Sequence, residues 1–292
     1  MSSQQEKEAR STSTAIEVTG QAANSTTDVG RARRRRNRLS SLSGIALIVV
    51  LAILWELSVR LAIIQSPNWP ALSQVFVSFW ELLRDGTFFT VFGPTLQRLA
   101  LGYVAAALSG ISIGLAMGYF AWIHRLLDPI VEILRPIPSP AYIPVAILFL
   151  GIGDIMKVFM IAFAAFFPIL LNTVAGVRSV DPVLIDTGRT FGLGTRQVVR
   201  KVVFPSALVY IFTGLRISLA IALILTVIAE EVAGNSGIGF YLLNAQRSFL
   251  VPEMYASVVA LAILGFALNR LFLLIESRVL SWNVGSQRPE IT

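Results

Sequence analysis

Side chains able to perform catalysis are sparse in this chain. His124 is the single histidine and there is no cysteine, so no metal-ligand set and no nucleophile with an adjacent base is present at a recognisable spacing. No Gly-x-x-x-x-Gly-Lys-Ser/Thr run occurs, and Gly237 and Gly239 lack the third glycine of a dinucleotide-binding fingerprint. The sequence therefore predicts no catalytic residue, no metal and no cofactor. Energy for any uphill work must come from a partner or from an ion gradient.

The most informative polar segment covers residues 178–205, between two long apolar stretches. Asp181 can cap a helix and Pro182 suits its first position. Gly192 can end that helix in a left-handed turn, and Thr195 can cap a second one. We therefore expect two short helices joined by the dipeptide that follows Gly192.

The second of these helices is predicted to be amphipathic. Its apolar side holds Val198, Val199, Val202 and Val203, with the basic residues pointing elsewhere. Pro205 marks the point where the next apolar span begins.

The elements that hold this segment are predicted to be membrane spans. Hydrophobic residues make up 55% of the chain and charged residues 14%, with a mean hydropathy of +0.71, which leaves too little polar surface for a soluble domain. A span takes about 20 apolar residues. Six are expected, at residues 42–64, 95–120, 127–150, 155–177, 206–229 and 253–277. We predict an all-α membrane protein with a transmembrane domain over residues 42–282.

Basic residues are distributed unevenly between the segments that join the spans. Lys and Arg concentrate in 1–41, 121–126, 178–205 and 278–292, whereas the alternate segments hold only Arg84 and Arg247. Because basic segments favour the cytoplasmic side, we expect a multi-pass protein of the cell (inner) membrane. Both termini and the 178–205 segment should be cytoplasmic.

The two ends of the chain are predicted to be tails. Residues 1–41 are polar and lack the aliphatic content to fold. Their arginine run, 31–38, would suit a nucleic acid, but its place just before a span favours a topology and anionic-lipid signal, so no nucleic-acid partner is expected. Residues 283–292 form the C-terminal tail.

Ionisable side chains within the spans should be paired or face water, because each is costly in hydrocarbon. Pairs three or four residues apart on one helix are expected: Glu56 with Arg60, Glu132 with Arg135, and Asp154 with Lys157.

Other ionisable residues have no such neighbour. Arg98, near the outer end of its span, is expected to extend towards the membrane surface. Glu230 and Glu231 are expected at a solvated helix end, where they could also repel anions or contact a binding protein. Arg216 lies about 16 Å along its helix from Pro205, near mid-membrane, and suits either a dimer interface or an anion path.

The third predicted span cannot be one regular helix, because it contains several prolines: Pro136, Pro138, Pro140 and Pro144. Broken helices at membrane depth persist where they line a cavity or pack against protein. We therefore expect the translocation path here, at Ser139 and Tyr142, with Arg216 as a further candidate.

The 178–205 segment resembles the EAA signature of ABC importer permeases, in which Glu-Ala-Ala, three residues, Gly, nine residues and Ile-x-Leu-Pro follow one another. The chain keeps the glycine at Gly192, the nine-residue gap and the proline at Pro205, while the remaining positions are filled by Asp186, Thr187, Gly188, Val202 and Phe204. Residues 42–282 are similar to the nitrate, sulfonate, taurine and bicarbonate importer class, through segments 54–57, 134–138, 214–216 and 237–239.

The resemblance implies a type I importer permease that works with two ABC ATPase subunits, an external substrate-binding protein and a second permease subunit, most simply a homodimer. It implies that residues of the 178–205 segment couple the chain to the ATPase: Leu184, Ile185, Asp186, Gly188, Arg189, Phe191, Gly192 and Pro205. The cargo it implies is a small anion such as a sulfonate, nitrate, taurine or bicarbonate. A thiamine-precursor pyrimidine or an aromatic acid is equally compatible with the spans.

Two other classes of protein lack their usual features in this sequence. A self-sufficient secondary transporter or channel usually has an internal repeat or a lone carboxylate at mid-span, and neither is evident. A membrane-embedded enzyme would need clustered catalytic groups. Copurification with an ATPase subunit would separate the importer from both.

Overall fold

The computed structural model describes residues 46–281, which fall into two compact units, one ending at Ser73 and the other beginning at Gln74. The tails predicted at 1–41 and 283–292 lie outside the described residues.

The first unit contains a helix over residues 46–60, followed by a segment of turns. Glu56 ties the two together, because its carboxylate pairs with Arg60 at 2.7 Å and accepts hydrogen bonds from the amide of Ser73 at 3.0 Å and its hydroxyl at 2.8 Å. Trp55 stacks on Trp69 with ring centroids 4.9 Å apart. The expected Glu56–Arg60 pair is confirmed. The predicted first span starts outside the described residues, and its described part is helical as far as residue 60.

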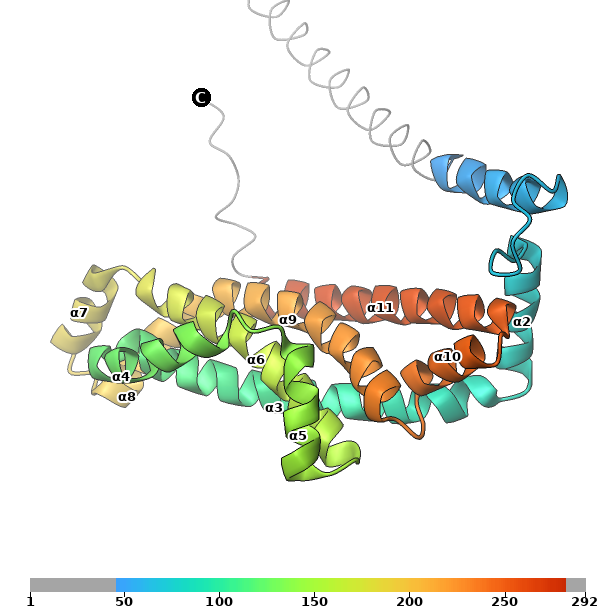
Figure 1. Ribbon diagram of the computed structural model, residues 1–292. Coiled ribbons are helices and arrows are strands. Elements are labelled where there is room, and N and C mark those ends of the chain that lie inside the picture. The colour runs from blue at the N-terminus through green and yellow to red at the C-terminus, as the bar shows by residue number, and fades with distance from the viewer. Residues whose placement is uncertain (1–45, 282–292) are drawn as a thin grey trace, which may run out of the picture. The chain divides into compact units, whose positions relative to one another are not determined.

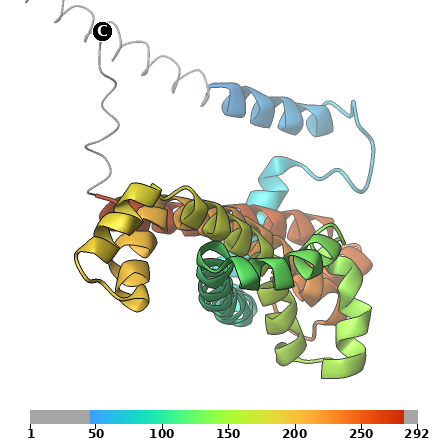
Figure 2. The ribbon, with the colours of Figure 1, turned by 90° about the vertical axis from the view of Figure 1, so that its left-hand side faces the viewer.

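The second unit is built on four long apolar helices: α3 (Thr87–Tyr119), α6 (Asp154–Arg178), α9 (Phe204–Ala233) and α11 (Val251–Val279). Each is long and apolar enough to cross a membrane and corresponds to one predicted span. Figures 1 and 2 show α3, α6 and α9 packed side by side, with α11 against α9.

The segment predicted as the third span is broken, as its prolines indicated. α4 (Ala121–Leu134) meets a second arm at 91°, and that arm consists of a short 3-10 turn, η1 (Ser139–Tyr142), followed by α5 (Ile143–Leu150). Residues 121–126, predicted to be a loop, form the first part of α4. The described chain thus has four helices that are long and apolar enough to cross a membrane, or five spans if the bent pair counts as one.

Glycines let α3 and α6 approach closely. A Cβ added at four glycines of α3 would overlap the side chain that faces it on α6. The facing pairs are Gly102 with Ile161, Gly110 with Ile169, Gly114 with Thr173 and Gly118 with Val177. Because lipid tails are as apolar as side chains, helix association in a membrane depends on such close packing. This pair of helices is therefore the rigid centre of the unit.

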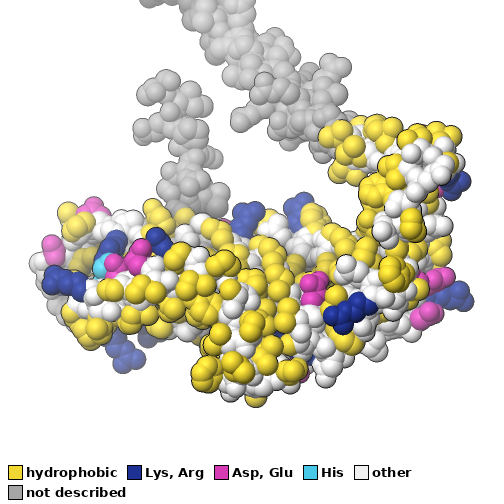
Figure 3. All heavy atoms as spheres, in the orientation of Figure 1, with side chains coloured by type: hydrophobic (Ala, Val, Ile, Leu, Met, Phe, Trp, Pro, Cys, Tyr) yellow, Lys and Arg dark blue, Asp and Glu magenta, His cyan; other side chains and the backbone are white. Residues whose placement is uncertain are grey.

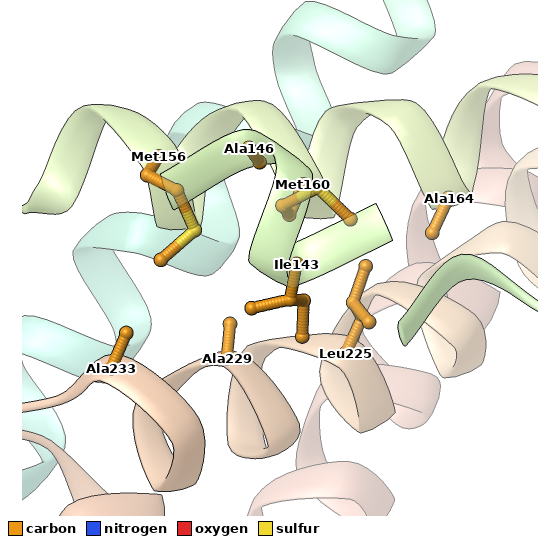
Figure 4. Packing of buried hydrophobic residues seen from close by; sticks show 8 residues of the cluster. All are labelled: Ile143, Ala146, Met156, Met160, Ala164, Leu225, Ala229 and Ala233. Carbon is orange, nitrogen blue, oxygen red and sulfur yellow. The ribbon is translucent and has the colours of Figure 1, made fainter. Parts of the chain in front are cut away.

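The bent segment closes over one half of α6 and α9. Figure 4 shows η1–α5 side chains between α6 and α9 in one buried aliphatic cluster: Ile143, Ala146, Met156, Met160, Ala164, Leu225, Ala229 and Ala233. Two shorter helices, α2 (Leu72–Arg84) and α10 (Ile238–Arg247), contribute Phe79 and Ile238 to another cluster with Phe92 of α3 and Ala260 of α11. The two clusters hold the ends of α3 and α9 that lie away from the 178–205 segment.

Candidate coupling surface and charged network

The 178–205 segment forms the two short helices that its sequence predicted. α7 runs over Pro182–Thr190 and α8 over Thr195–Val198. Asp181 caps α7, since its Oδ1 accepts a hydrogen bond from the amide of Val183 at 2.8 Å. The cap of α8 is Gly194 rather than Thr195, and Gln197 Oε1 accepts from the amide of Gly194 at 3.1 Å.

α7 ends in a tight left-handed turn at Gly192, whose φ is +78°. The amide of Gly192 donates to the carbonyl of Arg189 at 2.9 Å, and the amide of Leu193 donates to the carbonyl of Gly188 at 3.1 Å. These two bonds form a Schellman motif, which requires a positive φ at its glycine position. The predicted role of Gly192 in ending the helix is confirmed.

α8 does not stop before the next span. It passes through a π-helical turn, Val199–Val203, directly into α9, so that residues 195–233 form one helical run. Pro205 lacks the amide that a regular helix would need at this point, and the wider turn lies immediately before it. A displacement of α8 is therefore carried directly into α9.

The underside of the two short helices is packed on the bundle. Val198 and Val203 are fully buried in a cluster with Val177 of α6 and Ile211 of α9, and Ile185 of α7 packs against the same cluster. The predicted apolar side of α8 is confirmed. Ile185 was expected to fill a groove on the ATPase, but it faces its own bundle in part.

The side of α7 that faces away from the bundle is exposed and carries both apolar and charged side chains. Leu184 is 51% exposed and Phe191 81% exposed, while Asp186 and Arg189 form an exposed ion pair at 3.5 Å. Arg189 also donates to Tyr119 Oη at 3.4 Å, and that hydrogen bond raises the pKa of Arg189. A surface of two exposed apolar side chains beside one ion pair suits a protein partner.

A groove of about 370 Å³ runs beside α7. Its lining combines the ends of α3 and α6 with α7: Gly118, Tyr119, Val177, Arg178, Val180, Pro182, Ile185, Asp186 and Arg189. The groove widens the surface that α7 offers to a partner.

At the opposite end of α9 lies a buried charged network. Arg98 of α3 is 4% exposed and donates to Glu230 of α9, which is fully buried, at 2.7 Å and to Asp154 of α6 at 2.8 Å. Arg98 also donates to the carbonyl of Ser236 at 2.9 Å and to its hydroxyl at 2.8 Å. Lys157, 1% exposed, pairs with Asp154 at 3.6 Å. The two cations and two carboxylates balance one another, and every guanidinium donor of Arg98 has a partner.

The same network fixes the turn between α9 and α10. Glu230 accepts hydrogen bonds from the hydroxyl of Thr95 and from the amide of Gly239, while Thr95 accepts from the amide of Ile238 at 2.9 Å. Gly237 has φ +105°, and a Cβ there would overlap the carboxylate of Glu230. Only glycine allows the chain to pass so close to this carboxylate.

These positions correct two predictions. Arg98 does not extend towards the membrane surface, and Glu230 is not at a solvated helix end, because each neutralises the other across helices. The expected Asp154–Lys157 pair is confirmed. The sequence gives one signal of the network, a glycine cluster after Glu230 that indicates a close backbone approach, but it does not reveal that Arg98, about 130 residues earlier, is the partner.

Two of the three candidate path residues, Tyr142 and Arg216, line different hollows. Tyr142 lines a hollow of about 340 Å³ between α5 and α6, together with Phe163 and Phe149. Arg216 lines a separate groove of about 310 Å³ with Asn269 of α11. Ser139 lies at the bend beside Tyr142, at the start of η1. The bend and the Arg216 groove are thus two distinct regions.

Taken together, four long apolar helices, a broken span, and a capped helix pair that continues into α9 define a multi-pass helical membrane permease. Residues 99–281 match the family described as the binding-protein-dependent transport system inner membrane component. The chain belongs to this family.

Several curated proteins are similar over most of their length. The taurine transport system permease protein TauC of Escherichia coli is 32% identical, over 85% of this chain and 91% of its own. The nitrate import permease protein NrtB of Synechocystis is 31% identical, over 85% and 95%. A putative aliphatic sulfonates transport permease protein, SsuC of Bacillus subtilis, is 29% identical, over 91% and 96%.

Solved structures share the fold. A chain of the methionine ABC transporter MetNI in an inward-facing conformation superimposes with a TM-score of 0.57 at 22% identity, over 68% of this chain and 96% of that one. An amino acid ABC transporter gives a TM-score of 0.52 at 18% identity. The fold is that of a type I ABC importer permease.

Proposed function

We propose that this chain is the permease subunit of an ATP-driven importer for a small anion of the sulfonate, taurine or nitrate kind. Two ABC ATPase subunits drive it, an external binding protein delivers the anion, and two copies of the chain form the path. Three relatives named for transport of such solutes support this choice of cargo.

The observation that carries the proposal is the continuity of α8 with α9. The exposed side of α7, with Leu184, Asp186, Arg189 and Phe191, contacts the ATPase. Gly188 and Gly192 form the Schellman turn that sets α7 against α8, and Pro205 marks the point at which α8 has passed into α9. Movement of the ATPase is transmitted through this turn to a helix that spans the bundle.

In this proposal the α7 end of the bundle is cytoplasmic, as are both termini. Basic residues support that orientation, because Arg178, Arg189, Arg196, Arg200 and Lys201 gather at this end. Figure 3 shows charged side chains gathered near the end that carries α4 and α7, with hydrophobic side chains over α5 and its surroundings. The charged network of Arg98 then lies at the outer end.

The alternative of a self-sufficient secondary transporter receives no support from the network. Such a transporter needs a carboxylate that exchanges its proton or cation. Glu230 instead is fully buried and accepts hydrogen bonds from Arg98, Thr95 and Gly239. The energy source we propose is the ATPase pair.

The test is Gly192→Val in the complete transporter. Space around Gly192 is open, so the cost comes from the positive φ alone, which a β-branched residue disfavours by about 1–2 kcal/mol. We expect the variant to insert and assemble but to lose solute-stimulated ATP turnover. The matched control is Gly194→Ala, where φ is −68° and the space is equally open. Normal coupling in Gly192→Val would overturn the role of this turn, and failure of the chain to copurify with an ATPase would overturn the importer.

A further inference from the structure

α4 has three distinct sides. One packs on the bundle through Ile123, Leu127 and Val131, against Met117 of α3 and Leu170 of α6. A second is apolar and exposed, and consists of Trp122, Leu126, Ile130 and Ile133, each at least 52% exposed. The third is a line of ionisable residues spaced by four, four and three: His124, Asp128, Glu132 and Arg135. We call this third side the α4 polar line.

Within the described residues the charged contacts of the α4 polar line stay inside the line, and His124 Nδ1 is buried without a hydrogen-bond partner. His124 Nε2 lies 3.6 Å from Asp128 Oδ1, and Arg135 lies 3.2 Å from Glu132 Oε1. The side chains of Asp128, Glu132 and Arg135 are 46%, 53% and 45% exposed. Within residues 46–281, none of these ion pairs joins α4 to another helix. The line therefore faces away from the rest of its own bundle.

The depth of the line follows from what α4 packs against. Its partners on α6 run from Phe166 to Val174, and α6 ends at Arg178. At 1.5 Å per residue these partners lie about 6–18 Å from that end. The line thus extends from the α7 end of the bundle towards the middle of the membrane.

Two exposed sides of one helix at the same depth require different surroundings. The side of Leu126 and Ile133 suits lipid, whereas half-exposed carboxylate and guanidinium groups at this depth need water. The line ends beside the 91° bend, where Tyr142 Oη is buried without a hydrogen-bond partner in the described chain. One exposed side of α4 therefore suits lipid, and the other suits water.

We propose that the α4 polar line is the wall of a water-filled inner half of the path, and that Arg135, at its deep end, contacts the anion as it leaves the bend. The second part rests on the proposed function. Within the line Asp128 and Glu132 share one cation, Arg135, and a second cation, Arg125, lies on the same helix just outside the line. An anion then meets one cation with an adjacent carboxylate, which allows it to be held weakly and released.

The first experiment measures water access and needs no cargo. The chain has no cysteine, so Glu132→Cys and Ile133→Cys can be compared directly in membrane vesicles of the full transporter. Their Cα atoms differ in depth by about 1.5 Å. We expect a charged, membrane-impermeant methanethiosulfonate, added from the α7 face, to modify Glu132→Cys at least about tenfold faster. Equal rates, or faster reaction at residue 133, would overturn the water-filled wall.

A second matched pair repeats the comparison nearer the α7 end. Asp128→Cys should react faster than Leu126→Cys in the same assay. Because labelling does not depend on transport, this result stands or falls separately from the importer proposal. Slow reaction at both polar positions would remove the water-filled space.

The second experiment tests the contact with the anion. We expect Arg135→Gln to lower uptake of a sulfonate or nitrate roughly tenfold at an unchanged yield of the complex, and Arg135→Lys to restore most of it. Glu132→Gln leaves Arg135 uncompensated and should slow release, so that internal anion inhibits turnover at a lower concentration. Wild-type uptake by Arg135→Gln, or equal uptake defects in Arg135→Gln and Arg135→Lys, would overturn the contact while leaving the labelling result intact.

Discussion

The two ends of α9 differ in whether the charged residues around them are buried and paired across helices. At one end, Glu230 is fully buried and ion-paired to Arg98 of another helix. At the other, α9 continues into α8, and the charges of α7 are exposed and paired only with each other or with Tyr119. Removing either member of a buried ion pair costs much folding stability, whereas an exposed ion pair contributes little to it. One end is fixed and the other is free to engage a partner.

This difference suits a helix that transmits movement. The network ties α3, α6, α9 and the turn to α10 into one body, while the α7–α8 pair is held by aliphatic packing and helix caps. Substitutions at the network end should therefore affect stability, and substitutions at the α7 end should affect coupling. The following variants test that division, from the largest expected effect on stability to the smallest.

Arg98→Met should cause the largest loss. It leaves Glu230 buried without its cation, which costs about 3–5 kcal/mol, and we expect a lower thermal midpoint and a lower yield of purified protein. Adding Glu230→Met removes the unpaired charge, so the double variant should recover part of the loss. No recovery would mean that the two residues act independently.

Gly237→Ala should destabilise the same end by roughly 1–3 kcal/mol. The new Cβ meets the carboxylate of Glu230, and the φ of +105° is unfavourable for alanine. Gly153→Ala is the control, since its φ is −172° and no atom lies within 4 Å of the added Cβ. If both variants melt at the same temperature, the turn into α10 adapts more easily than its geometry indicates.

Asp181→Ala should cost α7 about 1 kcal/mol, because the amide of Val183 loses its cap. We expect faster hydrogen exchange in α7 and lower solute-stimulated ATP turnover, with little change in the global melting temperature. Asp181→Asn keeps a capping oxygen and should behave as the parent protein does. A large drop in global stability would contradict the separation of the two ends.

Phe191→Ala should leave stability within about 0.5 kcal/mol of the parent, yet weaken binding of the ATPase subunit roughly tenfold. Phe249→Ala is a matched control, because both phenylalanines are 81% exposed and Phe249 lies between α10 and α11, at the network end. Equal ATPase affinity in the two variants would remove Phe191 from the coupling surface.

Local features of the 178–205 segment were predictable from the sequence. The cap at Asp181, the left-handed turn at Gly192 and the valine side of α8 each depend on a few neighbouring residues, so spacing alone identifies them. The break in the third span was also predictable, because proline cannot donate the amide that a regular helix needs. The continuity of α8 with α9 was not, since Pro205 indicated a boundary and the π-helical turn accommodates it.

The charged residues show the same difference between features set by neighbouring residues and features set by distant ones. Pairs within one helix, such as Glu132 with Arg135, follow from spacing and are present. The partnership of Arg98 with Glu230 joins α3 to α9, and nothing in the local sequence of either residue specifies the other.

The sequence by itself determined the membrane class, the broken span and the capped helix pair, because hydropathy, proline chemistry and helix capping act over a few residues. Only the tertiary structure decided which charges are neutralised across helices, which side of α4 is left without a packed neighbour, and that α8 and α9 form one run. These depend on how distant helices pack, and packing in lipid is set by the fit of small residues and buried polar groups, not by hydrophobicity.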